Sequence, residues 1–345
     1  MTVPTHPTTE RPPKDRPSQL RGWAISLYCT AVVVMLATLG IPFARETVIL
    51  VIVGALAIMN IGRSKQEIAR VLVDWIPFTF VLLAYDVSRG IAFRLHRPVA
   101  FTPQIDAEKL LFFGKIPATI LQEHFYRFKP QWWDVITSLI YISHFLVPFI
   151  IAGLLWRRDW PAWRAYTTRF VAISFIAVAF FAAWPTAPPW AAALPEKNLI
   201  HLELERLDGK THSTRGLSLI GLKKGQTVID INKKSTNPYA AIPSLHSAFS
   251  LLVSITMWAR TKRRWVRGIL IAYPIAMVIS LVYSGEHYVV DAIAGFTLVW
   301  IVVTLEVRTR RRRVAWWTAK GATHWPRALS YLRPTSEANQ TTHHG

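Results

Sequence analysis

Two histidines and one aspartate lie at the edges of apolar stretches of this chain. His246 follows Pro243 in the segment Pro-Ser-Leu-His-Ser, and His287 and Asp291 belong to the segment Ser-Gly-Glu-His-Tyr-Val-Val-Asp that begins at Ser284. Ionisable side chains within membrane-spanning segments carry a large desolvation cost. They are therefore candidates for function, and we expect them to face a bundle interior or a water-filled cavity.

The spacing of His287 and Asp291 favours a histidine nucleophile. Two residues four apart on a helix share one face, so the carboxylate can accept a proton from one imidazole nitrogen and leave the other nitrogen available. The same pair could instead be a hydrogen bond that holds two helices together, or half of a metal site. The polar stripe around it could also be a small-residue packing seam. That stripe consists of Ser280, Ser284, His287, Asp291 and Gly295.

Ser244 stands at the expected start of the helix that carries His246. Pro243 suits a first helical turn, where its missing amide hydrogen is not needed. The free backbone amides and the positive end of the helix dipole favour an anion at such a position. We therefore expect Ser244 to help bind an anionic group of the substrate.

The elements that must position these residues are membrane-spanning helices. Of 345 residues, 52% are hydrophobic, and apolar runs long enough to cross a bilayer recur along the chain. The expected fold class is all-α, a polytopic membrane helix bundle of about eight transmembrane helices. The predicted spans are about 23–43, 46–61, 71–93, 133–155, 166–184, 242–259, 267–284 and 288–306.

Basic residues follow alternate spans, and this distribution argues against a nucleic-acid partner. The chain carries 40 Lys and Arg against 20 Asp and Glu, a formal net charge of +20. The positive-inside rule places the basic clusters and both termini in the cytoplasm, which puts the histidines on the extracytoplasmic side. The clusters lie in residues 63–70, 157–169, 260–267 and 308–313.

We expect the chain to have three parts and to reside in the plasma membrane. Residues 1–22 are predicted to be a disordered cytoplasmic tail, residues 23–306 the transmembrane domain, and residues 307–345 a basic cytoplasmic tail. The outer segments 106–126 and 194–207 mix apolar and charged positions at partly helical spacing. Such segments can be interfacial helices that cover an acceptor pocket, or they can be packed loops.

The two histidine segments extend into longer motifs. Residues 243–247 read Pro-Ser-Leu-His-Ser, and residues 283–295 read Tyr-Ser-Gly-Glu-His-Tyr-Val-Val-Asp-Ala-Ile-Ala-Gly. They resemble the second and third signature motifs of the type-2 phosphatidic acid phosphatase superfamily. Segments 85–89, 185–190 and 237–246 further resemble the branch that contains inositol phosphorylceramide synthase and related inositolphosphotransferases.

The resemblance implies a six-helix core and a role for each candidate residue. In that family the histidine matching His287 attacks phosphorus, the aspartate matching Asp291 orients it, and the histidine matching His246 protonates the leaving oxygen. The expected intermediate is a phosphohistidine, and the expected substrate is a phospholipid or polyprenyl phosphate. Such a mechanism requires no metal or other cofactor.

Two basic positions of the family motifs are missing from this chain. The third motif commonly opens Ser-Arg, but Ser280 is followed by Leu281, and Gly90 occupies the lysine position of the first motif. Because phosphoryl transfer depends on neutralising the phosphate oxygens, another cation must replace them. Arg89 is the first candidate, although an ion pair with Asp86 accounts for it equally well. The alternatives are Arg94, Arg97, Arg127 and Lys129.

The sequence does not determine which molecule accepts the phosphoryl group. With water the protein is a lipid phosphatase, and with a hydroxyl of an inositol, a sugar or a lipid it is a phosphotransferase. The long loop 185–241 and the motifs favour transfer slightly, because loops of that length often serve as lids or binding segments. A function of another class, a proton-coupled transporter with the two histidines and the aspartate as relay, is the remaining alternative.

Overall fold

The described part of the chain is built from helices. The computed structural model describes residues 16–39, several positions between 51 and 62, and residues 64–95, 97–194, 197–202, 212–222 and 237–319. Within these residues no β-strand forms, and the bridges between Ala100, Thr186 and Ala240 are isolated. The helices are α1 (Arg16–Leu39), α3 (Lys65–Arg94), α4 (Thr102–Leu111), α5 (Pro117–Phe125), α6 (Trp132–Arg158), α7 (Trp160–Ala183), α8 (Pro189–Ala192), the 3₁₀ helix η2 (His212–Ile220), α10 (Leu245–Trp258), α11 (Arg264–Tyr283) and α12 (Val289–Ala319).

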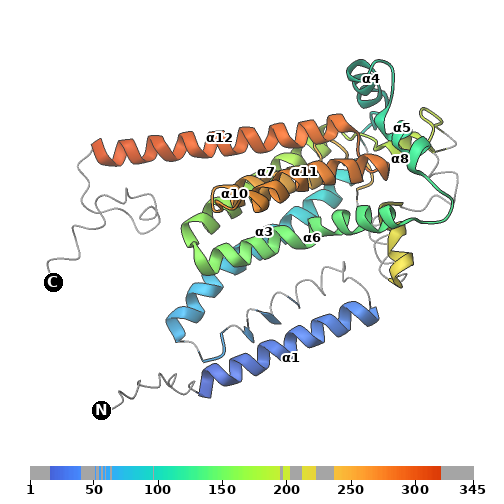
Figure 1. The fold of residues 1–345 in the computed structure, drawn as a ribbon. Coiled ribbons are helices and arrows are strands. Elements are labelled where there is room, and N and C mark those ends of the chain that lie inside the picture. The colour runs from blue at the N-terminus through green and yellow to red at the C-terminus, as the bar shows by residue number, and fades with distance from the viewer. Residues whose placement is uncertain are drawn as a thin grey trace, which may run out of the picture.

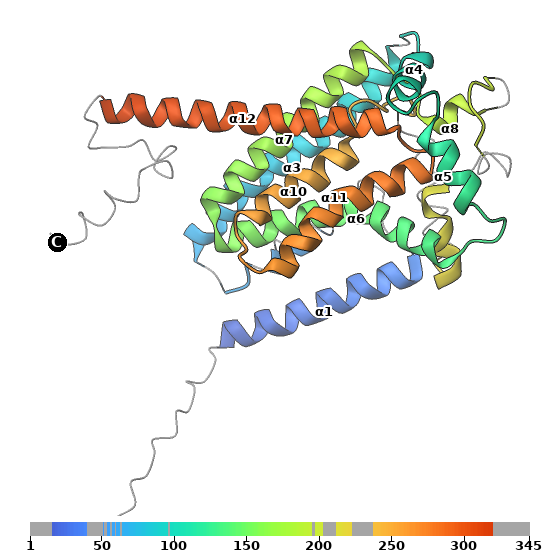
Figure 2. The ribbon, with the colours of Figure 1, turned by 45° about the horizontal axis from the view of Figure 1, so that its top comes forward.

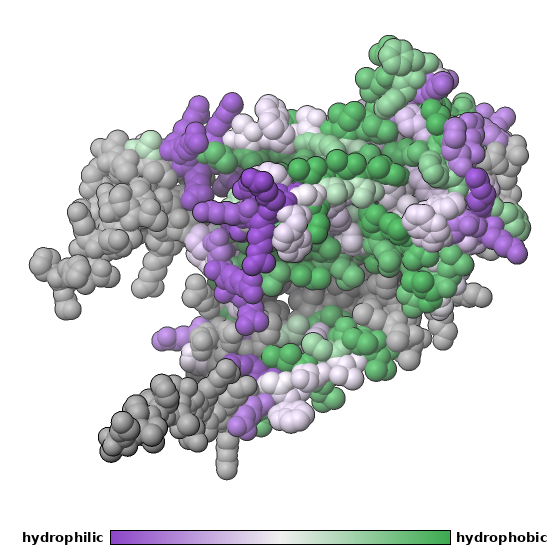
Figure 3. All heavy atoms as spheres, in the orientation of Figure 1, coloured by the Kyte–Doolittle hydropathy of each residue, from purple (hydrophilic) through white to green (hydrophobic). Residues whose placement is uncertain are grey.

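Four of the described helices are long and apolar enough to cross a membrane. They are α6, α7, α11 and the Val289–Arg312 part of α12. Figure 3 shows the matching surface, with hydrophobic residues across the middle of the bundle and hydrophilic residues at its ends. The protein is therefore an all-helical, multi-pass membrane protein, as the sequence predicted. The count of eight spans stays a prediction.

Helix α10 lies at the centre of the bundle. It packs against α6, α7, α11 and α12, whereas α1 runs along the outside of the bundle (Figures 1 and 2). Ala248 and Leu252 of α10 are completely buried, and Phe249 stacks on Phe170 of α7 with ring centroids 4.0 Å apart. His246 thus belongs to α10, and the two helices on either side of His287, α11 and α12, both pack against α10.

The described basic clusters gather at one end of the bundle, opposite the histidines. Helix α6 ends at Arg157 and Arg158, α10 and α11 are joined through basic residues at 260–264, and α12 carries its arginines in its C-terminal half. An ion pair between Arg260 and Asp159 (3.1 Å) joins two of these connections. The side of the membrane that this end faces remains a prediction.

A layer of short elements covers the other end of the bundle. Helices α4, α5 and α8 lie there, beside the start of α12 (Figures 1 and 2). They bury an apolar cluster that includes Ile105, Ala118, Ala192 and Tyr288. The Gln122 amide of α5 donates to the Tyr283 carbonyl at the end of α11 (2.8 Å). Of the two alternatives for 106–126, helices or packed loops, the structure shows helices, α4 and α5, while 194–207 lies partly outside the described residues.

Several predicted boundaries differ from the observed ones. Helix α1 begins at Arg16, so residues 16–22 of the predicted tail are helical, and α12 continues to Ala319 instead of ending near residue 306. Hydropathy places a boundary at the first charged residues, whereas Arg and Gln are good helix formers and extend the helices beyond the apolar segment. Residues 1–15 and 320–345, and most of the predicted span 46–61, lie outside the described residues.

Candidate active site

His287 and Asp291 form the hydrogen bond that their spacing predicted. The distance from His287 Nδ1 to Asp291 Oδ2 is 3.2 Å. Asp291 is completely buried, and 7% of His287 is exposed. A carboxylate that accepts from Nδ1 places the proton on that nitrogen and leaves Nε2 with its lone pair. The imidazole nitrogen that could attack a substrate is therefore Nε2.

The helical spacing of the two residues suggested that they share one helix. In the structure they meet across a turn instead. Helix α11 ends at Tyr283, Gly285 adopts a left-handed conformation with φ of +70°, and α12 begins only at Val289. Asp291 lies in the first turn of α12, where its Oδ2 also accepts from the Tyr288 amide (2.9 Å). A carboxylate is favoured at this position because the first amides of a helix have no intrahelical partner. The turn thus fixes His287 next to a helix start.

His246 faces His287 from the first turn of α10. The centroids of the two imidazole rings are 5.5 Å apart, with an angle of 60° between the rings. On its other side His246 stacks on Tyr141 of α6, at 5.1 Å and 24°. The structure therefore brings together the two motif histidines, which are separated by forty-one positions in the sequence.

Ser244 is the N-cap of α10, and the helix begins at Leu245. Pro243, which was expected in the first turn, lies two residues before the helix, because Ser244 caps it: the Ser244 hydroxyl accepts from the Ser247 amide (3.4 Å). Ser244 is completely buried, and its hydroxyl also lies 3.3 Å from that of Ser247. Its predicted contact with an anionic substrate group stays a prediction.

The two motifs are joined through their backbones. The Ser244 amide donates to the Asp291 carbonyl at 3.0 Å. One turn further along α12, a Cβ atom on Gly295 would lie 2.4 Å from the Ser244 carbonyl oxygen. The absence of a side chain at Gly295 is what allows α12 to approach the start of α10 so closely. This approach sets the separation of the two histidines.

A third histidine, His144 of α6, belongs to the same cluster and was missed by the sequence analysis. Its ring centroid lies 4.1 Å from that of His246, and its other face stacks on Phe249 at 5.7 Å and 16°. The signal was present in the sequence, because His144 is an ionisable residue inside the predicted span 133–155. It lacked a recognisable motif, and only the fold shows its proximity to His246.

The predicted phosphate-binding arginine is not placed by the structure. Arg89 lies on α3, and its side chain is outside the described residues, as is that of Asp86. Arg94 and Arg97 are exposed, and Arg127 donates to the carbonyl oxygens of Tyr126 (2.7 Å) and His124 (3.1 Å). The role of Arg89 as the replacing cation therefore stays a prediction.

A buried ion pair supports the turn that carries His287. Arg215 of η2 lies 3.6 Å from Asp134 of α6, and the Tyr283 hydroxyl donates to the same carboxyl oxygen at 2.9 Å. Arg215 also donates to the carbonyl oxygen of Arg127 at 2.7 Å. Because these contacts tie η2, α6 and the end of α11 together, we assign Arg215 a structural role. The sequence analysis did not single it out.

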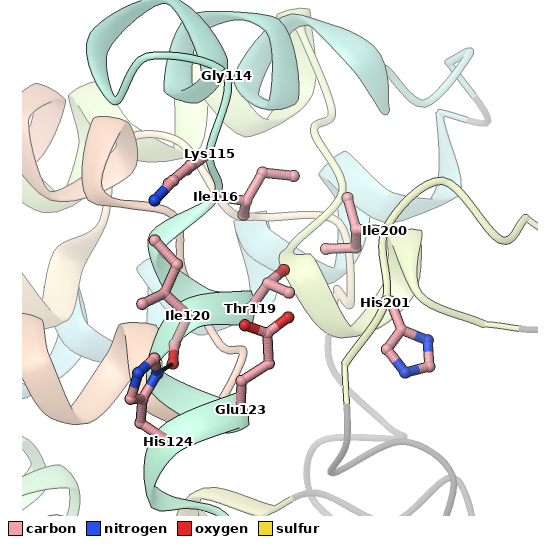
Figure 4. A pocket seen from close by; sticks show the side chains of 9 residues that line it. All are labelled: Gly114, Lys115, Ile116, Thr119, Ile120, Glu123, His124, Ile200 and His201. Carbon is pink, nitrogen blue, oxygen red and sulfur yellow. Dashed lines mark hydrogen bonds between the residues drawn. The ribbon is translucent and has the colours of Figure 1, made fainter.

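The described pocket lies in the outer layer and is lined by none of the predicted catalytic residues. It has a volume of about 410 Å³ and opens between α5 and the segment around His201 (Figure 4). Its lining combines charged and apolar side chains: Gly114, Lys115, Ile116, Thr119, Ile120, Glu123, His124, Ile200 and His201. Among the described residues, no group of three or more His, Cys, Asp or Glu side chains is arranged to hold a metal ion.

The paired histidines, the aspartate and the helical bundle can now be compared with known proteins. The sequence profile of the PAP2 superfamily matches residues 107–305, more than half of the chain. The chain belongs to the PAP2 superfamily. The matched region contains the end of α4, the helices α5 and α8 and both histidine motifs, whereas Arg89 of α3 lies before it.

Two curated relatives indicate the branch of the superfamily. Phosphoinositol dihydroceramide synthase of Bacteroides thetaiotaomicron is 25% identical over 234 residues, which cover 66% of this chain and 74% of that protein. Inositol phosphorylceramide synthase of Candida albicans is 29% identical over 176 residues, 48% of this chain and 34% of that protein. No solved structure matches the chain significantly. The protein is a membrane enzyme of phosphoric ester chemistry that acts on lipids, in the inositol phosphorylceramide synthase-like branch.

Proposed function

We propose that the protein transfers an inositol-phosphate type head group from a phospholipid to a lipid alcohol through a phosphohistidine intermediate. The observation that carries this proposal is the buried hydrogen bond between His287 and Asp291, with His246 facing it at 5.5 Å. A nucleophile whose tautomer is fixed by a carboxylate, next to a second group able to move a proton, is the arrangement that covalent transfer requires.

The proposed reaction has two steps. In the first, Nε2 of His287 forms a bond to phosphorus while the bond from phosphorus to the leaving oxygen breaks, and His246 gives its proton to that oxygen. In the second, His246 takes the proton of the acceptor hydroxyl, whose oxygen forms a bond to phosphorus as the bond to His287 breaks. Asp291 stabilises the positive charge that develops on the His287 ring in both steps. Ser244, the first amides of α10 and Arg89 are the proposed partners of the phosphate oxygens.

The names of the relatives support an alcohol acceptor rather than water. Both relatives are named as synthases of inositol-phosphate sphingolipids. We therefore propose phosphatidylinositol as donor and a ceramide-type lipid as acceptor. Two alternatives are to be distinguished from this reaction. They are the use of a polyprenyl phosphate as donor, and hydrolysis, in which water is the acceptor.

The proposed location of the site is the extracytoplasmic face of the plasma membrane. The described basic clusters lie at the end of the bundle opposite the histidines, and positively charged connections are retained in the cytoplasm. Both termini are then cytoplasmic. An impermeant thiol reagent should label cysteines introduced near Ser218 of η2 and miss those near Arg263. Labelling in the opposite pattern would place the site in the cytoplasm.

The function is tested with purified protein, phosphatidylinositol labelled in the inositol and a ceramide-type acceptor. We expect transfer of the label to the acceptor, and its loss together with the trapped phosphoenzyme in His287→Ala. His246→Ala should slow the reaction most with poor leaving groups, which need a proton, and least with good ones. Release of all label to water, unchanged by added acceptor, would establish a phosphatase instead. A trapped adduct in His287→Ala but not in His246→Ala would exchange the two roles.

A further inference from the structure

A buried carboxylate from the outer layer caps the helix that carries Asp291. Glu108 lies on α4, is completely buried, and its Oε1 accepts from the amides of Val289 (2.6 Å) and Val290 (3.2 Å). These are the first amides of α12, which have no partner within the helix. The sequence separation is 181 residues, so the contact is purely tertiary.

The capped amides lie between the two residues of the proposed nucleophile pair. Val289 and Val290, together with Tyr288, are the three residues between His287 and Asp291 in the sequence. On the bundle side, the same helix start is held by the contact of Asp291 with the Tyr288 amide and by the bond from the Ser244 amide to the Asp291 carbonyl. From the side of the outer layer, Glu108 fixes the helix start through its bonds to the Val289 and Val290 amides. Without it, two buried amides would lose their acceptor and the helix start would be fixed from one side alone.

We propose that Glu108 is a positioning residue for phosphoryl transfer, which fixes the start of α12 and thereby aims His287 at the phosphorus. This inference rests on the proposed function, since it takes His287 as the nucleophile. Outer-shell hydrogen bonds of this kind commonly affect activity by one to two orders of magnitude, because reacting atoms must be held within a fraction of an ångström. The α4 helix is then part of the catalytic apparatus and not only a cover.

The protonation state of Glu108 gives the proposal a second, independent readout. Burial raises the pKa of Glu108 to about 7, against the opposing effect of the Val290 and Val289 amides, and the charge of Asp291 adds to the increase. Among the described residues, Asp291 is the charged group that contributes to this rise, and burial, Asp291 and Glu108 in turn raise the pKa of the Tyr288 phenol. Glu108 therefore changes charge near neutral pH, beside the pair that carries the reaction.

The sign of the effect differs between stability and rate. A carboxyl whose folded-state pKa is raised binds its proton more tightly in the folded state. Its contribution to stability is present at low pH and declines as the pH rises from about 4.5 to about 7. The reaction rate should increase over the same pH range, because a negative charge on Glu108 stabilises the positive charge that His287 acquires on attack. We therefore expect a rise in kcat through about pH 7.

Three variants test the proposal in the full-length protein. Glu108→Ala removes the acceptor, Glu108→Gln keeps an oxygen that can accept from both amides but has no charge, and Asp106→Ala removes an exposed carboxylate from the same helix as control. We expect kcat to fall about tenfold or more in Glu108→Ala, with KM changed by less than about twofold. Glu108→Gln should recover most of this loss and lack the rise in kcat near pH 7, and Asp106→Ala should match the parent.

Amide hydrogen exchange of residues 287–292 gives a readout that does not depend on activity. Exchange should be faster in Glu108→Ala than in Glu108→Gln or Asp106→Ala, while the rest of the bundle stays protected. The proposal fails if Glu108→Ala keeps its kcat and its protection, or if a fall in kcat is not recovered in Glu108→Gln and the pH profile keeps its shape. Failure of the proposed function is distinct, since the parent protein would then show no transfer that His287→Ala removes.

Discussion

The interior of the bundle and its histidine end are stabilised by contacts of opposite kinds. Around α10 the buried side chains are aromatic and aliphatic, as in the stack of Phe170 on Phe249, and hydroxyls such as that of Ser174 bond back to their own helix. At the histidine end, the fully buried side chains include the carboxylates of Glu108, Asp134 and Asp291. The interior is held by apolar packing, whereas the histidine end adds to its own apolar cluster a set of directed bonds made by buried carboxylates.

This difference shows what each region must achieve. Apolar packing sets the distance between helices but does not favour one orientation of a side chain strongly. A carboxylate that accepts from particular amides fixes both position and direction, at the risk of leaving atoms unsatisfied. Within the described residues, Asp291 Oδ1 and Glu108 Oε2 are buried without a hydrogen-bond partner. Such a costly arrangement is expected where orientation matters more than stability.

The largest effect should come from Asp291→Asn at the histidine end. The substitution keeps the shape of the side chain but removes the charge that is proposed to fix the His287 tautomer and to stabilise its positive form. We expect kcat to fall about a thousandfold, with little change in KM. Steady-state transfer assays and the yield of trapped phosphoenzyme measure this fall. A decrease below tenfold would show that the pair is structural.

Asp134→Ala should destabilise the histidine end of the bundle without changing the proposed catalytic residues. It removes the partner of Arg215 and the acceptor of the Tyr283 hydroxyl, so a buried guanidinium loses its counter-charge. We expect a loss of about 3–5 kcal/mol in the free energy of unfolding. Thermal unfolding in detergent measures the loss. The double variant with Arg215→Ala should lose less than the sum of the single variants, and strict additivity would contradict the pairing.

Leu252→Ala tests the interior of the bundle. Leu252 is completely buried in the cluster around α10, and its truncation leaves a cavity. The expected loss is about 2–4 kcal/mol of unfolding free energy, close to that of Asp134→Ala. The molecules that remain folded should keep the kcat and the pH profile of the parent. A changed pH profile would show that packing in the interior also sets the chemistry, and the distinction between the two regions would be lost.

The smallest effect is expected at Gly295, where the two regions meet. A methyl group there would press on the Ser244 carbonyl, so Gly295→Ala should force α12 away from α10 at a cost of about 1–3 kcal/mol. Gly268→Ala is the matched control on α11, since a Cβ at that position meets nothing within 4 Å. Thermal unfolding compares the two, and kcat should fall only in Gly295→Ala. Equal behaviour of both variants would mean that α12 shifts without consequence.

The sequence predicted the bundle well because spanning helices follow from local composition. The spans expected at 133–155 and 267–284 are α6 (Trp132–Arg158) and α11 (Arg264–Tyr283). It also predicted that His287 and Asp291 form a hydrogen bond, because a short motif determines a short-range contact. The helical spacing of the pair suggested one helix, although the predicted spans 267–284 and 288–306 already left His287 at their junction.

The remaining parts of the site depend on contacts between distant segments. Glu108 reads as one more charged residue of an amphipathic segment until the fold places it on the amides of Val289 and Val290. His144 reads as an isolated histidine until α6 packs against α10. Neither contact leaves a local signal in the sequence.

The length of α10 determines how deep the reaction takes place. Fourteen residues at 1.5 Å each give a helix of about 21 Å, whereas the hydrocarbon layer of a bilayer is about 30 Å thick. If α10 runs along the membrane normal and Arg260, beyond its far end, lies at one surface, the start of α10 and His246 lie about 9 Å below the opposite surface. The phosphate of a donor lipid would then enter the site laterally from the bilayer, while the lipid stays in its leaflet. Water would be scarce at such a depth, which favours the proposed transfer to a lipid hydroxyl over hydrolysis.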